Sequence, residues 1–137
     1  MSGLRKGLFG GLALSVLALL TGCPRAGGRR VSPAEAQALL GDPGVLVLDV
    51  RTPEEYARGH LPGARLMPLQ GLEASLDALS SSDWAEALVY CASGWRSASA
   101  ADILKRKGWS RVADLQGGLS AWSAAGLPVV VDGGGAR

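Results

Sequence analysis

The sequence predicts an α/β domain whose central, mostly parallel sheet is covered by helices on both faces. Short apolar runs alternate along the chain with segments of helical periodicity, an order typical of repeated βαβ units. The runs at residues 45–50 and 87–90 are almost wholly apolar, as expected for strands buried on both faces. Because 47% of the residues are hydrophobic, the chain can bury the core of one domain.

The first expected helix begins at Ser32 and ends near Leu40. Ser32 is a good N-cap, Pro33 suits the first turn, and Glu35 completes a capping box. The sequence Gly-Asp-Pro-Gly at residues 41–44 ends this helix and leads into the first apolar strand.

The same capping pattern recurs at residues 52–55 and predicts a short helix that Gly59 ends. We then expect a turn at 60–64 and a short strand at 65–67. Leucines at helical spacing predict an amphipathic helix over 69–80. The remaining expected elements are a strand at 87–90, a helix at 97–107 capped by Gly108, a strand at 112–115, a helix at 119–125, a terminal strand at 128–131 and a disordered tail at 132–137.

Residues 1–22 are expected to be a cleaved leader. Two basic residues precede an uncharged apolar run at 8–20, whose 13 residues suit a secretory h-region better than a membrane-spanning helix. Leu-Thr-Gly-Cys at residues 20–23 resembles a bacterial lipobox, and the resemblance implies cleavage before Cys23 and a diacylglyceryl thioether on its sulfur. The alternative is an ordinary signal peptide with a chance cysteine, although no A-x-A-like cleavage site lies nearby.

A lipidated Cys23 would make this an exported bacterial lipoprotein, anchored at the periplasmic face of the inner or outer membrane. Residues 23–31 would then form the lipidated cysteine and a flexible linker to a domain at 32–131. The chain has 14 basic and 12 acidic residues, but both basic residues of the leader are lost on cleavage, so the mature balance is 12 against 12. With no basic stripe interleaved with aromatics, we expect no nucleic-acid partner.

The second of the two cysteines, Cys91, is the main candidate for chemistry. If Cys23 is lipidated, Cys91 has no disulfide partner within the chain, and a lone thiol is a liability in an oxidising compartment unless it has a use. Cys91 also follows an expected buried strand, at the sheet edge where α/β proteins bind ligands. The alternative is a small buried structural residue.

The loop from Cys91 to Arg96 (Cys-Ala-Ser-Gly-Trp-Arg) can stabilise a thiolate. Ser93 and Gly94 permit a tight turn, so that successive N–H groups can converge as an anion-binding nest at a helix N-terminus. Together with Arg96, this should lower the pKa of Cys91 below the roughly 8.5 of a free thiol. The one histidine, His60, is distant in sequence, so a Cys–His dyad is poorly supported.

Three stretches match, in order, the signatures of one family. They are Asp49-Val50-Arg51 with Glu55-Tyr56 and Gly-His-Leu-Pro-Gly-Ala at 59–64; the loop 91–96; and Gly117-Gly118-Leu119 with Trp122. On these motifs, residues 31–131 resemble a single-domain rhodanese, a sulfurtransferase of the thiosulfate type.

The resemblance implies a rhodanese-like fold and a ping-pong reaction. Cys91 would take the outer sulfur of a small anionic donor such as thiosulfate and pass it, as a persulfide, to cyanide or a thiol. Ala92, Ser93, Gly94, Trp95 and Arg96 would bind the substrate. We expect no cofactor and no metal, and the sequence names no protein partner.

Rival functions are a non-catalytic module that retains the fold, a phosphatase or arsenate reductase, and a thiol oxidoreductase. An intact cysteine and a complete loop argue against the first. Related phosphatases have one residue more between cysteine and arginine, whereas residues 91–96 span six. The chain has no C-x-x-C motif for the third.

Four other residues have competing interpretations. Arg96 contacts the substrate anion, or is a solvated residue paired with Asp102. Asp49 and Arg51 are pocket candidates, and for Arg51 we favour a structural ion pair, with Glu55 as a partner. For His60 we favour a packed, hydrogen-bonded side chain over a base. Trp95 walls the pocket or rests on the neighbouring helix, and Trp122 belongs to the core.

Overall fold

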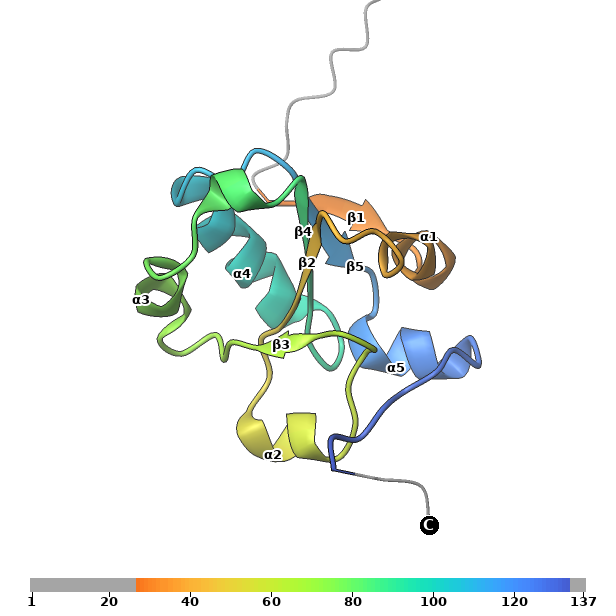
Figure 1. Cartoon of the computed structure of the whole chain (residues 1–137). Helices are drawn as coiled ribbons and strands as arrows, with labels where there is room; N and C mark the ends of the chain where they lie inside the picture. The colour runs from red at the N-terminus through yellow and green to blue at the C-terminus, as the bar shows by residue number, and fades with distance from the viewer. Residues whose placement is uncertain (1–26, 134–137) are drawn as a thin grey trace, which may run out of the picture.

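The computed structural model describes residues 27–133. The expected leader, the lipobox with Cys23 and the last four residues lie outside this range. Within it, five strands form one parallel sheet in the order β1-β5-β4-β2-β3 (Figure 1). The strands are β1 (Arg29–Val31), β2 (Val45–Asp49), β3 (Arg65–Leu66), β4 (Glu86–Tyr90) and β5 (Val112–Leu115).

Helices cover both faces of this sheet, which confirms the predicted fold class (Figure 1). The α-helices are α1 (Pro33–Leu39), α2 (Pro53–Ala57), α3 (Leu72–Leu76), α4 (Trp95–Arg106) and α5 (Gly118–Ala124), with a 3₁₀ turn η1 at Ser81–Asp83. Alternate residues of the central strands enter two cores. One core packs against α3 and α4, and the other packs against α1 and α5.

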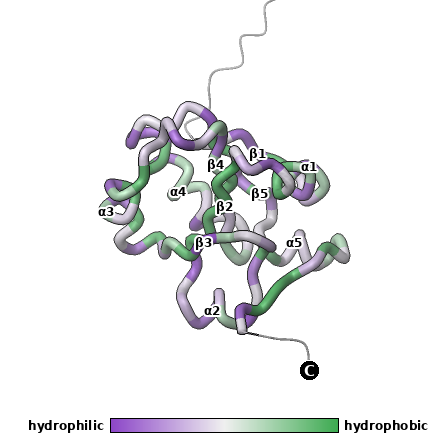
Figure 2. The backbone as a smooth tube through the Cα atoms, viewed as in Figure 1, coloured by the Kyte–Doolittle hydropathy of each residue, from purple (hydrophilic) through white to green (hydrophobic). Residues whose placement is uncertain are grey.

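The central strands are buried along their whole length, as their apolar sequences predict. Figure 2 shows hydrophobic residues concentrated on β2 and β4 in the middle of the molecule. Both predicted capping boxes are present. Ser32 and Glu35 exchange bonds at the start of α1, and Thr52 and Glu55 do the same at the start of α2.

The expected linker ends earlier than predicted, because Arg29–Val31 form strand β1. This strand pairs in parallel with β5, and the N–H of Gln116 donates to the carbonyl of Val31 at 2.8 Å. Val31 is fully buried in the core beneath α1. Two arginines precede it, so the segment lacks the apolar run from which the other strands were predicted.

The helix expected at 69–80 is much shorter in the structure. Gly71, at φ 87°, is the residue before α3, and the helix ends at Leu76. Leu69 and Leu79 still pack against the same core as partly buried residues. The leucine spacing therefore predicted burial correctly but overestimated the length of regular helix.

The terminal strand expected at 128–131 is a single antiparallel bridge between His60 and Val130. Figure 2 shows this segment as a hydrophobic stretch leading towards the C-terminus, and its three valines are exposed. Among the described residues, no helix is long and apolar enough to cross a membrane.

Candidate active site

The predicted cysteine loop lies at the carboxyl edge of the sheet. Strand β4 ends at Tyr90, Cys91 follows directly, and α4 begins at Trp95, two residues earlier than expected. Gly94 makes this tight connection possible, since it adopts φ 110° as the residue before the helix.

The loop surrounds the sulfur of Cys91, which is fully buried. The N–H of Gly94 donates to Sγ at 3.0 Å, and the hydroxyl oxygen of Ser97 lies 3.7 Å from Sγ. Burial alone would raise the pKa of the Cys91 thiol, but the N–H groups of Ser97, Gly94 and Ser93 outweigh it, and the net pKa is lowered. The expected nest of N–H groups is therefore present around the sulfur.

The N–H groups in the first turn of helix α5 donate hydrogen bonds to the carbonyls of the cysteine loop. The N–H of Leu119 donates to the carbonyl of Cys91 at 2.8 Å, and that of Ser120 donates to the carbonyl of Ala92 at 3.0 Å. A side chain at Gly118 would overlap the carbonyl oxygen of Cys91 and reach within 2.7 Å of the carbonyl carbon of Ala92. The absence of a side chain at Gly118, the first residue of α5, therefore lets the helix contact the loop backbone.

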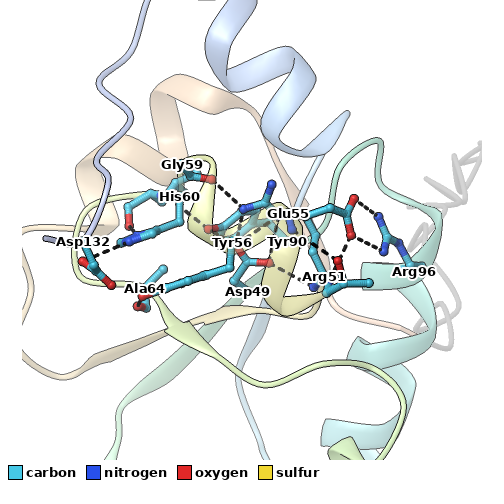
Figure 3. A network of polar contacts seen from close by, with 12 residues as sticks. Asp49, Arg51, Glu55, Tyr56, Gly59, His60, Ala64, Tyr90, Arg96 and Asp132 are labelled. Carbon is cyan, nitrogen blue, oxygen red and sulfur yellow. Dashed lines mark hydrogen bonds and ion pairs between the residues drawn. The ribbon is translucent and has the colours of Figure 1, made fainter. Parts of the chain in front are cut away.

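Arg96 pairs with Glu55 of α2, and not with Asp102. Its guanidinium donates two parallel bonds to the carboxylate, at 2.9 and 2.8 Å (Figure 3). These bonds are the main reason that the pKa of Glu55 falls to about 2. The pKa of Arg96 is raised chiefly by Glu55 and also by Cys91, so the guanidinium lies in the electrostatic reach of the thiol.

The predicted partner of Arg51 is wrong, since Glu55 is occupied by Arg96. Arg51 instead forms a buried ion pair with Asp49, with Nη2 and Oδ2 2.6 Å apart, and Nη2 also donates to the carbonyl of Gly59 at 2.7 Å (Figure 3). The hydroxyl of Tyr90 donates to the same Asp49 oxygen at 2.6 Å. Each buried charge is therefore paired and hydrogen-bonded, which satisfies the condition for burying it.

His60 is packed and hydrogen-bonded, in agreement with the expectation. Its ring stacks on Tyr56 at 3.9 Å between centroids, and Nδ1 lies 2.9 Å from the carbonyl of Leu61. Nε2 lies 3.2 Å from a carboxylate oxygen of Asp132, a residue that we expected in the frayed tail (Figure 3). These contacts tie the turn after α2 to the C-terminal segment.

Trp95 projects from the first turn of α4 and is 71% exposed, so it does not rest in the core as Trp122 does. It lines a groove of about 420 Å³ beside the cysteine loop. Arg30, Asp102 and Asp114 also line this groove.

Two polar residues at the sulfur were missed by the sequence analysis. Ser97 is fully buried in the first turn of α4, and its hydroxyl lies 2.6 Å from Oδ1 of the buried Asp114 in β5. A serine just after the loop and a single acidic residue within an apolar strand were the available signals. Among residues 27–133, no group of three or more His, Cys, Asp or Glu side chains is placed to hold a metal ion.

Residues 32–125 match the model of the rhodanese-like domain, and the chain therefore belongs to the rhodanese family. A sulfurtransferase from Allochromatium vinosum is 35% identical over 103 residues, which cover 75% of this chain and 94% of that protein. A thiosulfate sulfurtransferase, GlpE, from Ectopseudomonas mendocina is 37% identical over 97 residues, which cover 70% of this chain and 85% of that protein.

Solved structures share this fold. A rhodanese-related protein from Thermoplasma volcanium superposes with a TM-score of 0.67 at 30% identity, covering 76% of this chain and 99% of its own. A protein of unknown function from Rhodopseudomonas palustris, described as a possible tyrosine phosphatase, superposes with a TM-score of 0.69 at 34% identity. That match covers 75% of this chain and 85% of its own.

Gly118→Ala should destabilise the protein more than Gly126→Ala. Both glycines have a positive φ, but a side chain at Gly126 would meet open space. We expect a loss of about 1 kcal/mol for Gly126→Ala from backbone strain, and about 2–4 kcal/mol for Gly118→Ala from strain and overlap with the loop. Denaturant unfolding measures both. Equal losses would show that α5 does not press on the cysteine loop.

Proposed function

We propose that this protein is a sulfurtransferase that carries sulfane sulfur as a persulfide on Cys91. The observation that carries the proposal is the Gly94 N–H that donates to the buried Sγ at 3.0 Å, together with the N–H groups of Ser97 and Ser93 that help to lower the pKa of Cys91. Such groups stabilise a thiolate, and they would equally stabilise the terminal sulfur anion of a persulfide. Relatives described as sulfurtransferases support the same activity.

The proposed reaction has two half-reactions. The Cys91 thiolate attacks the outer sulfur of thiosulfate, a bond forms between the two sulfurs, and sulfite leaves with the electrons of the broken S–S bond. Cyanide or a thiolate then attacks the outer sulfur of the persulfide, and the Cys91 thiolate is regenerated with the electrons of that bond. The reaction needs no histidine base, because the lowered pKa of Cys91 favours the thiolate.

Arg96 has the position and charge to attract an anionic donor. It lies beside the loop, within the electrostatic reach of Cys91, and it is partly exposed. Its present partner is the carboxylate of Glu55, which shows that the guanidinium can hold an oxyanion with two parallel bonds. In the proposed reaction, the sulfonate oxygens of the donor exchange with that carboxylate or bind alongside it.

The proposed location is the outer side of a bacterial plasma membrane or the periplasmic face of the outer membrane. This part of the proposal rests on the leader sequence, namely the apolar run at 8–20 and the lipobox that ends at Cys23. Two or three acyl chains on the N-terminal cysteine would anchor the domain firmly, which one chain does not achieve.

Cys91→Ser should abolish the formation of thiocyanate from thiosulfate and cyanide. The assay uses residues 24–137, which keep all of the described structure and contain Cys91 as the single thiol. After exposure to thiosulfate alone, the intact mass of the wild type should rise by one sulfur atom, and that of Cys91→Ser should not.

Three results would contradict the proposed activity. A variant as active as the wild type would remove Cys91 from the reaction. A wild type with neither thiocyanate production nor a mass gain would favour a non-catalytic module. Hydrolysis of p-nitrophenyl phosphate without sulfur transfer would favour a phosphatase.

Arg96→Ala should raise the KM for thiosulfate about ten- to hundredfold, the effect of removing charged hydrogen bonds from a bound anion. Arg106→Ala is the matched control, since Arg106 lies in the last turn of α4, three turns from the loop. Initial rates over a range of thiosulfate concentrations separate KM from kcat. An unchanged KM in Arg96→Ala would mean that this guanidinium only braces α2.

Cys23→Ala should release the protein from the membrane fraction and abolish its labelling by radioactive palmitate. Without the thiol, no thioether can form, and an anchor of covalent lipid is lost. Cys91→Ala serves as the control and should remain membrane-bound and labelled. Retention of Cys23→Ala as an integral membrane protein would refute the lipobox assignment.

A further inference from the structure

The fully buried Ser97 and the nearly buried Asp114 connect the sulfur of Cys91 to the groove beside Trp95. Sγ lies 3.7 Å from the Ser97 hydroxyl oxygen, and that oxygen lies 2.6 Å from Oδ1 of Asp114. The three side chains come from the end of β4, the first turn of α4 and β5. They form a continuous chain of atoms that can exchange hydrogen bonds.

The single hydrogen of the Ser97 hydroxyl sets the polarity of this chain. Two acceptors compete for it, the carboxylate of Asp114 at 2.6 Å and the carbonyl of Gly94 at 3.0 Å. A charged acceptor at the shorter distance is the stronger one, so an ionised Asp114 takes the hydrogen. A lone pair of the Ser97 oxygen is then free to accept the S–H of Cys91.

We propose that Asp114 receives the proton of Cys91 through the hydroxyl of Ser97. The S–H bond of Cys91 breaks and its proton forms a new O–H bond on Ser97, while Ser97 passes its original hydrogen to the carboxylate. The electron pair of the S–H bond stays on sulfur, so a thiol and a carboxylate become a thiolate and a carboxylic acid, with no change in total charge. The inference rests on the proposed function, because that function requires Cys91 to become a thiolate. Asp114 acts on Cys91 through Ser97 and is therefore a positioning residue.

The proton transfer also reverses the direction of the hydrogen bonds between Cys91, Ser97 and Asp114, and the reversed bonds stabilise the thiolate. Once Asp114 holds the proton, it donates to the Ser97 oxygen, and the Ser97 hydrogen turns towards the thiolate. The thiolate then receives an O–H donor in addition to the N–H of Gly94 at 3.0 Å. A protonated Asp114 and an ionised Cys91 therefore stabilise one another.

Burial of Asp114 and the N–H groups around Cys91 bring the pKa values of these two acids closer together. Burial raises the pKa of Asp114, against the opposing effects of the Ser97 hydrogen bond and of Arg30, its neighbour across the β1–β5 pair. The pKa of Cys91 is lowered, because the N–H groups of Ser97, Gly94 and Ser93 outweigh the effect of burial. Two interacting groups whose pKa values converge share a proton and titrate as a pair.

Asp114 also gives the proton a route to water. It lines the groove that Trp95, Arg30 and Asp102 also line, whereas Cys91 is fully buried. A proton that reaches Asp114 can leave through this groove while a donor occupies the sulfur. In this proposal the groove is the path by which the proton leaves Asp114 for solvent.

The pH dependence of Cys91 alkylation by iodoacetamide tests the proposal. The full-length chain is used, and adducts at Cys91 are counted by peptide mass, so that Cys23 does not interfere. The wild-type rate should rise in two steps, because the thiolate is formed first by proton sharing and then by loss of the last proton. Asp114→Asn and Ser97→Ala should each show one step, with a rate lower by about tenfold near pH ~6, the effect of one pKa unit.

Asp102→Asn is the matched control, since it removes the same charge from the same groove without touching Ser97. It should keep the two-step profile. A wild-type profile in either Asp114→Asn or Ser97→Ala would overturn the proposal, and so would an equal loss in Asp102→Asn. Alkylation needs no sulfur donor, so a two-step profile without thiocyanate production would refute the proposed function and leave this inference standing.

Discussion

The closure of one short loop around a buried sulfur is the constraint on which the rest of the site depends. The chain must turn from β4 into α4 within a few residues while its N–H groups face inward, and Gly94 supplies the left-handed backbone for this turn. The outer side of the loop must then be held, and Gly118 lets the backbone of α5 reach the carbonyls of Cys91 and Ala92. The same loop geometry therefore directs its N–H groups towards the sulfur and its carbonyl groups towards α5.

Two ion pairs near the loop differ in burial, and so in what they can do. Asp49 and Arg51 are 0% and 4% exposed. Asp49 also accepts from the Tyr90 hydroxyl and Arg51 also donates to a backbone carbonyl, so removing either member of the pair would leave an unpaired buried charge. Glu55 and Arg96 are 27% and 22% exposed, and water can compete for both. The first pair fixes the end of β2, whereas the partial exposure of the second supports the proposed exchange of Glu55 for an anionic donor.

The sequence predicted those elements that depend on interactions between residues close together in the chain. The apolar runs gave strands β2, β4 and β5, and the capping boxes at Ser32 and Thr52 gave the starts of α1 and α2. Strand β1 was missed because its order comes from pairing with β5, more than eighty residues away along the chain. The partner of Arg51 was misjudged for the same reason, since Glu55 belongs to Arg96, 41 residues further on.

By itself, the sequence determined the α/β fold, the position of Cys91 at a strand end and the thiolate-stabilising character of its loop. Each of these follows from periodicity, glycine placement and the order of residues within a short segment. Only the tertiary structure decided that Trp95 borders an open groove and that Ser97 links Cys91 to Asp114. The reason is physical: a hydrogen bond between α4 and β5 depends on how the helix packs across the sheet, which no local pattern of residues specifies.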